Sequence, residues 1–435
     1  MTTPDIGTYN KEELFLNCTY FIFPMKISDP ERLNSYLASS GGWVRVDEPF
    51  NTQYILRYSS DMNKSRDGRL TSYRYAEAKK IPLYMFGSRI ESRVEKHSLE
   101  ESGHTPSLDD VVLYVFGSGI AFLEFRILYG DMTPDEIVEF VYLFRSLRFN
   151  ESKDWLGFTD GSIGVGNAIE KLMPHKESGT ELCFSNPSEV KRQALIFSAV
   201  CIEGVMNGAT EKELDRLRYY LSHGYNNDFP FDGDGSEHFG KYEMCFNTGG
   251  GLYWGGAQDG LACVTAAPPK YQYERICSDY HFLYLLLLNQ RFSAISYIED
   301  LACPEIDLKR TKSVMKKVVD LKIRYSFRVI SDDSNFQTIY GGMYEVLEID
   351  NLLADLEDSN DRLSEILQEE HKANERRFGL LLGGLSILAI FSALIDLSDF
   401  ADKIFKNTVG NWVSIGVNAV IIIVALLLVF RKGKD

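Results

Sequence analysis

Two aspartates close a long apolar segment late in the sequence. Residues 378–400, FGLLLGGLSILAIFSALIDLSDF, carry Asp396 and Asp399 and no other charged residue. If several copies of this segment surrounded one axis as helices, their carboxylates would form an acidic ring that attracts cations. The alternative is a plain solvated cap at the end of an apolar helix. The spacing therefore raises the hypothesis of a cation pathway.

Helical steps back from Asp399 bring further residues near the same face of the segment. Three leucines on this face would form an apolar constriction, which blocks ions by dewetting until the helices move. The predicted pore-lining residues are Asn374, Leu381, Leu385, Leu388, Ser392, Asp396 and Asp399. Of these, Asp396 and Asp399 are also the candidate metal ligands, as a ring that receives a hydrated cation.

Two apolar segments have the length of membrane spans, since about 20 helical residues cross a hydrocarbon core of roughly 30 Å. We expect a first span at 378–397, an external loop at 398–411, a second span at 412–430 and a basic tail at 431–435. Basic residues before the first span and after the second predict that both termini are cytoplasmic. A buried hairpin of a water-soluble domain is the alternative.

Composition narrows the classes of partner. The 435 residues carry a formal net charge of -16, which argues against binding to nucleic acid, although one basic pocket could still bind a small anionic ligand. The seven cysteines form no CxxC pair and are interpreted as reduced cytosolic thiols. The first residues show no pattern of a cleavable signal, so most of the chain is expected in the cytoplasm.

Residues 1–270 alternate strand-like and helical patterns, which predicts a cytoplasmic α/β (α+β) domain. In MTPDEIVEF, Thr133 and Glu136 have the spacing of a capping box and Pro134 stands at the first helical position. The Gly-rich turns lack the Lys and hydroxyl of a phosphate-binding loop, and the histidines lack zinc spacing. No catalytic constellation emerges, so we do not expect an enzyme. Arg57, Tyr73 and Arg74 are the candidate residues for an adenine nucleotide, by charge and stacking.

Residues 271–377 form a predicted helical region. The apolar run Phe282–Leu288 is too short for a membrane span and predicts a buried core helix. A further helix is expected over 308–330. From Tyr344 to Phe378 there is no Pro or Gly, and apolar residues recur at near-heptad steps, which predicts one long acidic helix that continues into the first span.

Three features together resemble the CorA family: LYVFGSGIAFLEFRI leading into TPDEIVEF, FRVISDD and IYGGMYEVLEI before a long acidic helix, and two terminal spans with a basic tail. The resemblance implies a homopentamer with a cytoplasmic α/β domain, a long stalk helix, a pore-lining first span and an outer second span. CorA magnesium channels have a Gly-Met-Asn triplet, commonly followed by Phe. Here Leu397, Ser398 and Asp399 precede Phe400, so the triplet is absent.

CorA-like proteins without the triplet accompany type III CRISPR systems. The resemblance therefore implies a membrane ion channel of antiviral defence, opened by a nucleotide second messenger such as an adenosylmethionine–AMP conjugate (SAM-AMP) and located in the bacterial inner membrane. One alternative is a constitutive divalent-cation (Mg2+) transporter of the CorA family. A second alternative is a membrane-anchored enzyme or scaffold.

Overall fold

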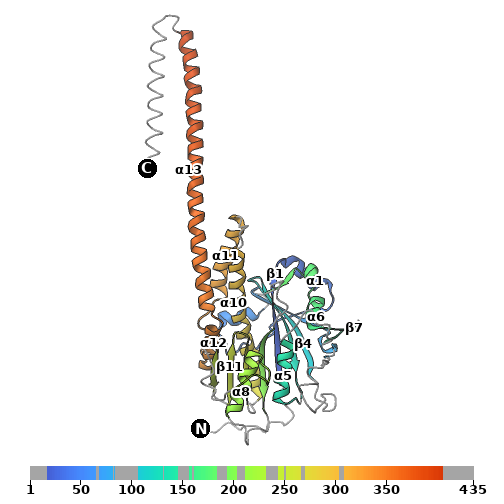
Figure 1. Cartoon of the computed structure of the whole chain (residues 1–435). Coiled ribbons are helices and arrows are strands. Elements are labelled where there is room, and N and C mark those ends of the chain that lie inside the picture. Colours follow the sequence, from blue (N-terminus) through green and yellow to red (C-terminus); the bar gives the residue numbers. More distant parts are fainter. Residues whose placement is uncertain are drawn as a thin grey trace, which may run out of the picture. The chain divides into compact units, whose positions relative to one another are not determined.

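The computed structural model describes residues 17–64, 68–81, 83, 106–130, 132–145, 156–158, 161–183, 194–202, 211–231, 243–248, 251–265, 270–302 and 308–404. Contacts between residues divide the chain into two units, Met1–Ser359 and Asn360–Asp435. The described part of the first unit has mixed α/β content with a large sheet (Figure 1).

The strands of the large sheet are short to medium in length. Their bounds are β1 Cys18–Ile27, β2 Trp43–Val46, β3 Leu70–Tyr75, β4 Ser107–Phe116, β5 Ile120–Leu128, β8 Thr180–Leu182, β9 Leu195–Cys201, β10 Met244–Thr248, β11 Leu252–Ala257 and β12 Gly260–Thr265. Among the described residues their order is β10-β11-β12-β9-β1-β5-β4-β3-β2, and β8 also pairs with β1. Only β12 and β9 run parallel in this set. A separate small sheet contains β6 (Leu156–Phe158) and β7 (Gly161–Ile163).

The central strands β1 and β5 are rich in aromatic and β-branched residues, which suit a pleated surface buried on both sides. Their register pairs Phe21 with Phe125 and Ile22 with Glu124. Because successive side chains of a strand point to opposite faces, Phe21 and Phe125 lie on one face of the sheet and Glu124 on the other.

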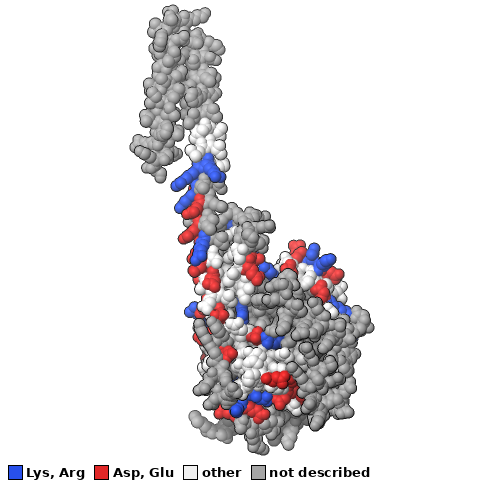
Figure 2. Space-filling model, in the orientation of Figure 1, with Lys and Arg blue, Asp and Glu red and all other residues white. Residues whose placement is uncertain are grey.

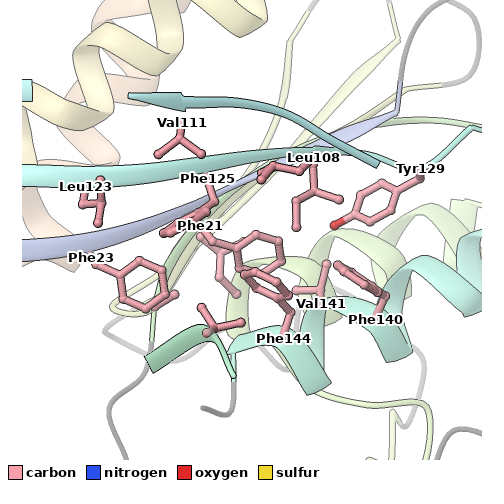
Figure 3. Packing of buried hydrophobic residues seen from close by; sticks show 14 of the residues in the cluster. Phe21, Phe23, Leu108, Val111, Leu123, Phe125, Tyr129, Phe140, Val141 and Phe144 are labelled. Carbon is pink, nitrogen blue, oxygen red and sulfur yellow. The ribbon is translucent and has the colours of Figure 1, made fainter. Parts of the chain in front are cut away.

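Four helices cover the first face of the sheet. They are α1 (Pro30–Ser39), α5 (Pro134–Arg145), α6 (Val165–Leu172) and α8 (Glu211–His223). Figure 3 shows Phe140 and Phe144 of α5 directed toward the strands, and the ring centroids of Phe21 and Phe144 are 4.4 Å apart. Each fully buried aromatic side chain of this kind contributes about 1.5–3 kcal/mol, so the cluster fixes α5 on the sheet.

The start of α5 confirms the predicted capping box. The Thr133 backbone N–H donates to Glu136 Oε2 at 2.7 Å, and the Glu136 N–H donates to Thr133 Oγ1 at 3.4 Å. Pro134 is the first residue of the helix, where its missing N–H costs nothing.

The second face of the sheet is covered by a helix with a π-helical turn in its path. This helix comprises α9 (Lys270–Arg275), the π-turn η4 (Ile276–Tyr280) and α10 (His281–Ala302). Every residue from Phe282 to Leu288 is buried, which confirms the predicted core helix. Ser118 donates to Asn289 Oδ1 at 2.6 Å and holds α10 on the β4–β5 turn.

Two helix boundaries differ from the predictions. The helix expected over 308–330 is α11, Leu308–Arg324. Beyond its end, Tyr325 and Ile330 are buried. The long helix expected from Tyr344 is interrupted between α12 (Ser334–Val346) and α13 (Ile349–Ile404). Leu347 is fully buried at this break, and Glu348 adopts a left-handed φ of 54°.

The remaining described helices are single turns. They are α2 (Arg57–Ser60), η1 (Asp61–Asn63), η2 (Ala78–Lys80) and α7 (His175–Ser178).

Candidate functional site

The segment Tyr273–His281 places titratable and nucleophilic side chains against the large sheet. Tyr273 and Cys277 approach Cys18, and His281 approaches Glu124. The segment runs from α9 through the π-turn η4 to the first residue of α10. A π-turn adds one residue to the helical repeat and so changes which side chains face inward, and such turns are frequent at functional sites. We call Tyr273–His281, with the side chains that it contacts, the junction site.

At the end of the junction site, His281 forms a buried pair with the sheet. His281 Nε2 lies 2.7 Å from Glu124 Oε2, and the two side chains are 1% and 2% exposed. Aromatic rings enclose the imidazole, with the Tyr20 ring centroid 4.2 Å and the Phe197 centroid 5.1 Å from that of His281. Each of these buried polar side chains needs the other as its hydrogen-bond partner, so the pair fixes the start of α10 to β5.

One helical turn earlier, two cysteines meet. Cys18 Sγ on β1 lies 3.9 Å from Cys277 Sγ on η4. The Tyr273 hydroxyl is also 3.9 Å from Cys18 Sγ, and it accepts a hydrogen bond from Arg126 at 2.9 Å. The hydrogen bond with Cys277 and the nearby Arg126 charge lower the pKa of Cys18 to about 7, against the opposing effect of burial. A thiol with this pKa is partly a thiolate at neutral pH, which is the nucleophilic form.

Asp279 is the third unusual group of the junction site. Its side chain is fully buried, and neither carboxylate oxygen has a hydrogen-bond partner among the described residues. Burial raises its pKa to about 7, while the charge of Arg275 opposes the rise. Arg275 itself pairs with Asp333 at 3.2 Å and lies over the Tyr54 ring, 4.1 Å from its centroid.

Cys18 and Asp279 have pKa values near neutral pH, and the Cys18 thiolate is a nucleophile, but the two side chains belong to different small clusters. In the described part of the chain, no group of three or more His, Cys, Asp or Glu residues is placed to hold a metal ion. The junction site can therefore exchange protons and supply a thiolate nucleophile. It lies where the sheet meets the helix that covers its second face.

The three predicted nucleotide-binding residues lie in different surroundings. Arg57 begins α2, is 92% exposed and pairs with Asp61 at 3.6 Å. Arg74 on β3 pairs with Asp110 at 2.7 Å. Tyr73 packs against the hydrophobic core of the first face, and as its neighbour on the strand Arg74 points to the opposite face. The structure therefore does not place Tyr73 and Arg74 on one surface, and the ligand site stays a prediction.

The predicted pore-lining residues all fall within α13. Leu381 and Leu385 are 66% and 61% exposed in the single chain. The side chains of Asn374, Leu388, Ser392, Asp396 and Asp399 lie outside the described part of the structure, as does the predicted second span at 412–430. The acidic ring and the rest of the constriction stay predictions.

A change of surface character occurs within α13. The exposed basic residues Lys372, Arg376 and Arg377 precede an apolar stretch, and Figure 2 shows this change from blue to white atoms along the helix. The exposed apolar side chains of the stretch are Phe378, Leu380, Leu381, Leu382 and Leu385. Glycines take the intervening positions 379, 383 and 384, so this stretch has no polar side. Within the residues that the structure describes, no helix reaches both the length and the hydropathy of a membrane span.

Comparison with known protein families, with curated proteins and with solved structures finds no match for this chain.

Sequence reasoning did not find the junction site. Cys18 and Cys277 are 259 positions apart, and neither belongs to a short motif. The available signal was weak: Cys277 and Asp279 are a small and a charged residue that directly precede a strongly apolar helix.

Proposed function

We propose that this protein is a CorA-like, homo-oligomeric ion channel of the bacterial inner membrane, gated by its cytoplasmic domain. The proposal rests on the continuity of α13, which runs without interruption from Ile349 to Ile404. The same helix contains buried residues of the first unit and the exposed apolar stretch that follows Arg377.

The first turns of α13 are well anchored. Ile349, Leu353 and Leu356 are buried, and Lys322 of α11 forms an ion pair with Glu357. Removing these apolar side chains from their contacts would cost about 1.5–3 kcal/mol each. A rearrangement of the domain would therefore move the start of α13 instead of being absorbed by a loose linker.

The apolar stretch supports a membrane environment for the later part of the helix. Large exposed apolar surfaces on a protein mark contact with lipid or with another chain. Basic residues directly before the stretch are the usual cytoplasmic flank of a span. Five copies of α13 around one axis would bring Asp396 and Asp399 into an acidic ring and Leu381, Leu385 and Leu388 into a constriction.

An adenine-nucleotide messenger such as SAM-AMP is the proposed opening signal, bound by the cytoplasmic domain. The absence of the Gly-Met-Asn triplet at Leu397–Asp399 favours this gated effector over a constitutive Mg2+ transporter. An effector of type III CRISPR defence would act by collapsing the membrane potential of an infected cell.

The test is current through the full-length protein in planar bilayers under a KCl gradient. We expect no current from the protein alone and a cation-selective current after addition of SAM-AMP. Replacing both aspartates, Asp396→Asn with Asp399→Asn, should move the reversal potential toward zero. Asp361→Asn, an exposed acidic residue on the same helix before the apolar stretch, is the matched control and should leave the reversal potential unchanged.

Each alternative predicts a different outcome of this experiment. Mg2+ flux without messenger would overturn gating in favour of a transporter. Absence of any current, with a catalytic activity that survives removal of residues 378–435, would overturn the channel in favour of an anchored enzyme. An unchanged reversal potential in the double variant would remove the acidic ring.

A further inference from the structure

Cys18 and Cys277 are brought together by elements that the sequence separates widely. Cys18 is the first residue of β1, at the centre of the sheet, and is fully buried. Cys277 is the second residue of the π-turn η4 and is partly exposed. Their sulfur atoms are 3.9 Å apart, whereas a disulfide has a sulfur–sulfur distance of about 2.0 Å. A small movement of one side chain or of the turn would join them.

The surroundings of the pair favour a thiolate. The Arg126 guanidinium donates to the Tyr273 hydroxyl at 2.9 Å, and that hydroxyl lies 3.9 Å from Cys18 Sγ. Arg126 Nη1 is also 3.2 Å from Asp109 Oδ2, so the guanidinium is fixed between the two groups. Positive charge and hydrogen-bond donors beside a sulfur stabilise its ionised form. The hydrogen bond with Cys277, together with the Arg126 charge and the Tyr273 hydroxyl, lowers the pKa of Cys18 to about 7.

The other cysteine of the pair has the opposite character. Burial and the hydrogen bond with Cys18 raise the pKa of Cys277. One sulfur is therefore the thiolate and the other keeps its proton until the first has reacted. This division of roles is the one that oxidation in two steps requires, with one attacking and one resolving cysteine.

We propose that Cys18 and Cys277 form an oxidation site whose substrate is hydrogen peroxide. The Cys18 thiolate attacks one peroxide oxygen, so that an S–O bond forms, the O–O bond breaks and hydroxide leaves. Cys277 then attacks the Cys18 sulfur, so that the S–S bond forms and the S–O bond breaks. Its proton, with the one that Cys18 gave up, converts both hydroxides to water. The two thiols are oxidised by two electrons and the peroxide is reduced to two molecules of water.

The disulfide would join β1 to the π-turn. The π-turn η4 lies between Tyr273 and the buried His281–Glu124 pair. Formation of the disulfide would therefore shift this turn, which carries Asp279. Reduction by a dithiol would reverse the change. The inference concerns the described domain alone and stands apart from the proposed channel.

The test uses the purified full-length protein, first reduced, then freed of reductant and exposed to hydrogen peroxide. Free thiols are next blocked with iodoacetamide, and the digest is analysed by mass spectrometry. We expect a peptide pair linked through Cys18 and Cys277, which disappears when dithiothreitol is added before digestion. Cys183 serves as the internal control: burial raises its pKa to about 12, so it should stay reduced in peroxide and be alkylated once the protein is unfolded.

Variants distinguish the roles of the two cysteines. Cys277→Ser should leave a Cys18 sulfenic acid that reacts with dimedone, whereas Cys18→Ser should leave Cys277 unreactive. Arg126→Gln should slow the formation of the linked peptide several-fold at pH 7, because the Cys18 thiolate loses the positive charge beside it. The wild-type experiment remains decisive if a variant fails to fold. No Cys18–Cys277 peptide, or oxidation of Cys183 as fast as that of Cys18, would overturn the proposal.

Discussion

Glu124 and His281 form a hydrogen-bonded pair with a 2.7 Å separation, and both side chains are almost completely removed from solvent. Glu124 belongs to β5 in the middle of the sheet. His281 begins α10 directly after the π-turn. The pair therefore fixes the point at which the helix of the second face resumes its regular α-helical path.

Removing one partner of the Glu124–His281 pair should destabilise the folded protein. Glu124→Ala leaves a buried imidazole without its partner, and we expect the free energy of unfolding to fall by about 3 kcal/mol or more. Glu124→Gln should cost less, because an amide can still bond with one imidazole tautomer. Thermal unfolding of the purified protein gives the comparison. Glu77→Ala removes an exposed ion pair with Lys80 at 2.8 Å and should change stability much less, because solvent screens this pair. Equal effects at the two sites would contradict the argument.

Asp279 should make stability depend on pH. Its pKa is raised from 3.8 to about 7 in the folded protein by burial. Below pH 4 both states hold the proton, so the contribution to stability is fully present there. As the pH rises from 4 to 7 the unfolded chain releases its proton first, and the free energy of unfolding falls.

Asp279→Asn removes this titration. We expect the variant to gain stability relative to wild type as the pH is raised from 5 to 8, with a difference on the order of 1 kcal/mol or more. Melting temperatures of both proteins across this range give the measurement. Asp358→Asn, at an exposed position of α13, should follow the wild-type curve. Parallel curves for wild type and Asp279→Asn would show that the buried carboxyl does not titrate in this range.

The break before α13 predicts an unusual response to glycine. Glu348 holds a φ of 54°, which costs about 1 kcal/mol for a residue with a Cβ. Glu348→Gly should therefore keep or raise the melting temperature, although it loses the 3.3 Å hydrogen bond from Gln258. Glu348→Val should lower stability by about 1–2 kcal/mol.

Glu345→Gly is the matched control within α12. Here glycine replaces an exposed helical residue and should lower stability by up to about 1 kcal/mol. Loss of stability of the same size at positions 345 and 348 would argue that the left-handed conformation carries no strain.

The apolar constriction of the proposed channel can be tested at the two of its residues whose side chains are described. Leu381→Ser with Leu385→Ser should increase the current without messenger several-fold, because polar side chains keep a narrow passage wet. Leu382 is the control, since it is also exposed but lies about 100° from Leu381 and about 60° from Leu385 around the helix. Bilayer recordings would contradict the assignment if Leu382→Ser raised the basal current as much as the double variant.

Local sequence rules located several elements correctly, for identifiable reasons. The capping box at Thr133 and Glu136 involves residues three positions apart, and the core helix Phe282–Leu288 is set by its own apolar composition. Both depend on short-range properties that the sequence displays directly.

Other features depend on contacts that no local pattern encodes. The helix breaks at Leu347 and Glu348 without Gly or Pro, because the tertiary environment buries Leu347. The π-turn and the approach of Cys277 to Cys18 arise only when α9 and α10 pack across β1. For Arg57, Tyr73 and Arg74, residue type alone named candidates, but their surroundings follow from strand alternation and from ion pairs formed after folding.

The position of β1 has a consequence for the order of events during synthesis. This early strand lies between β5 and β9, and its Thr19 bonds with Ser198, which the ribosome adds 179 residues later. The nascent chain must hold an aromatic strand without its second neighbour for much of translation, a period in which unpaired edges invite aggregation. The residues from 378 onward are made after all the strands described here, so the sheet can close before the most apolar part of the chain leaves the ribosome.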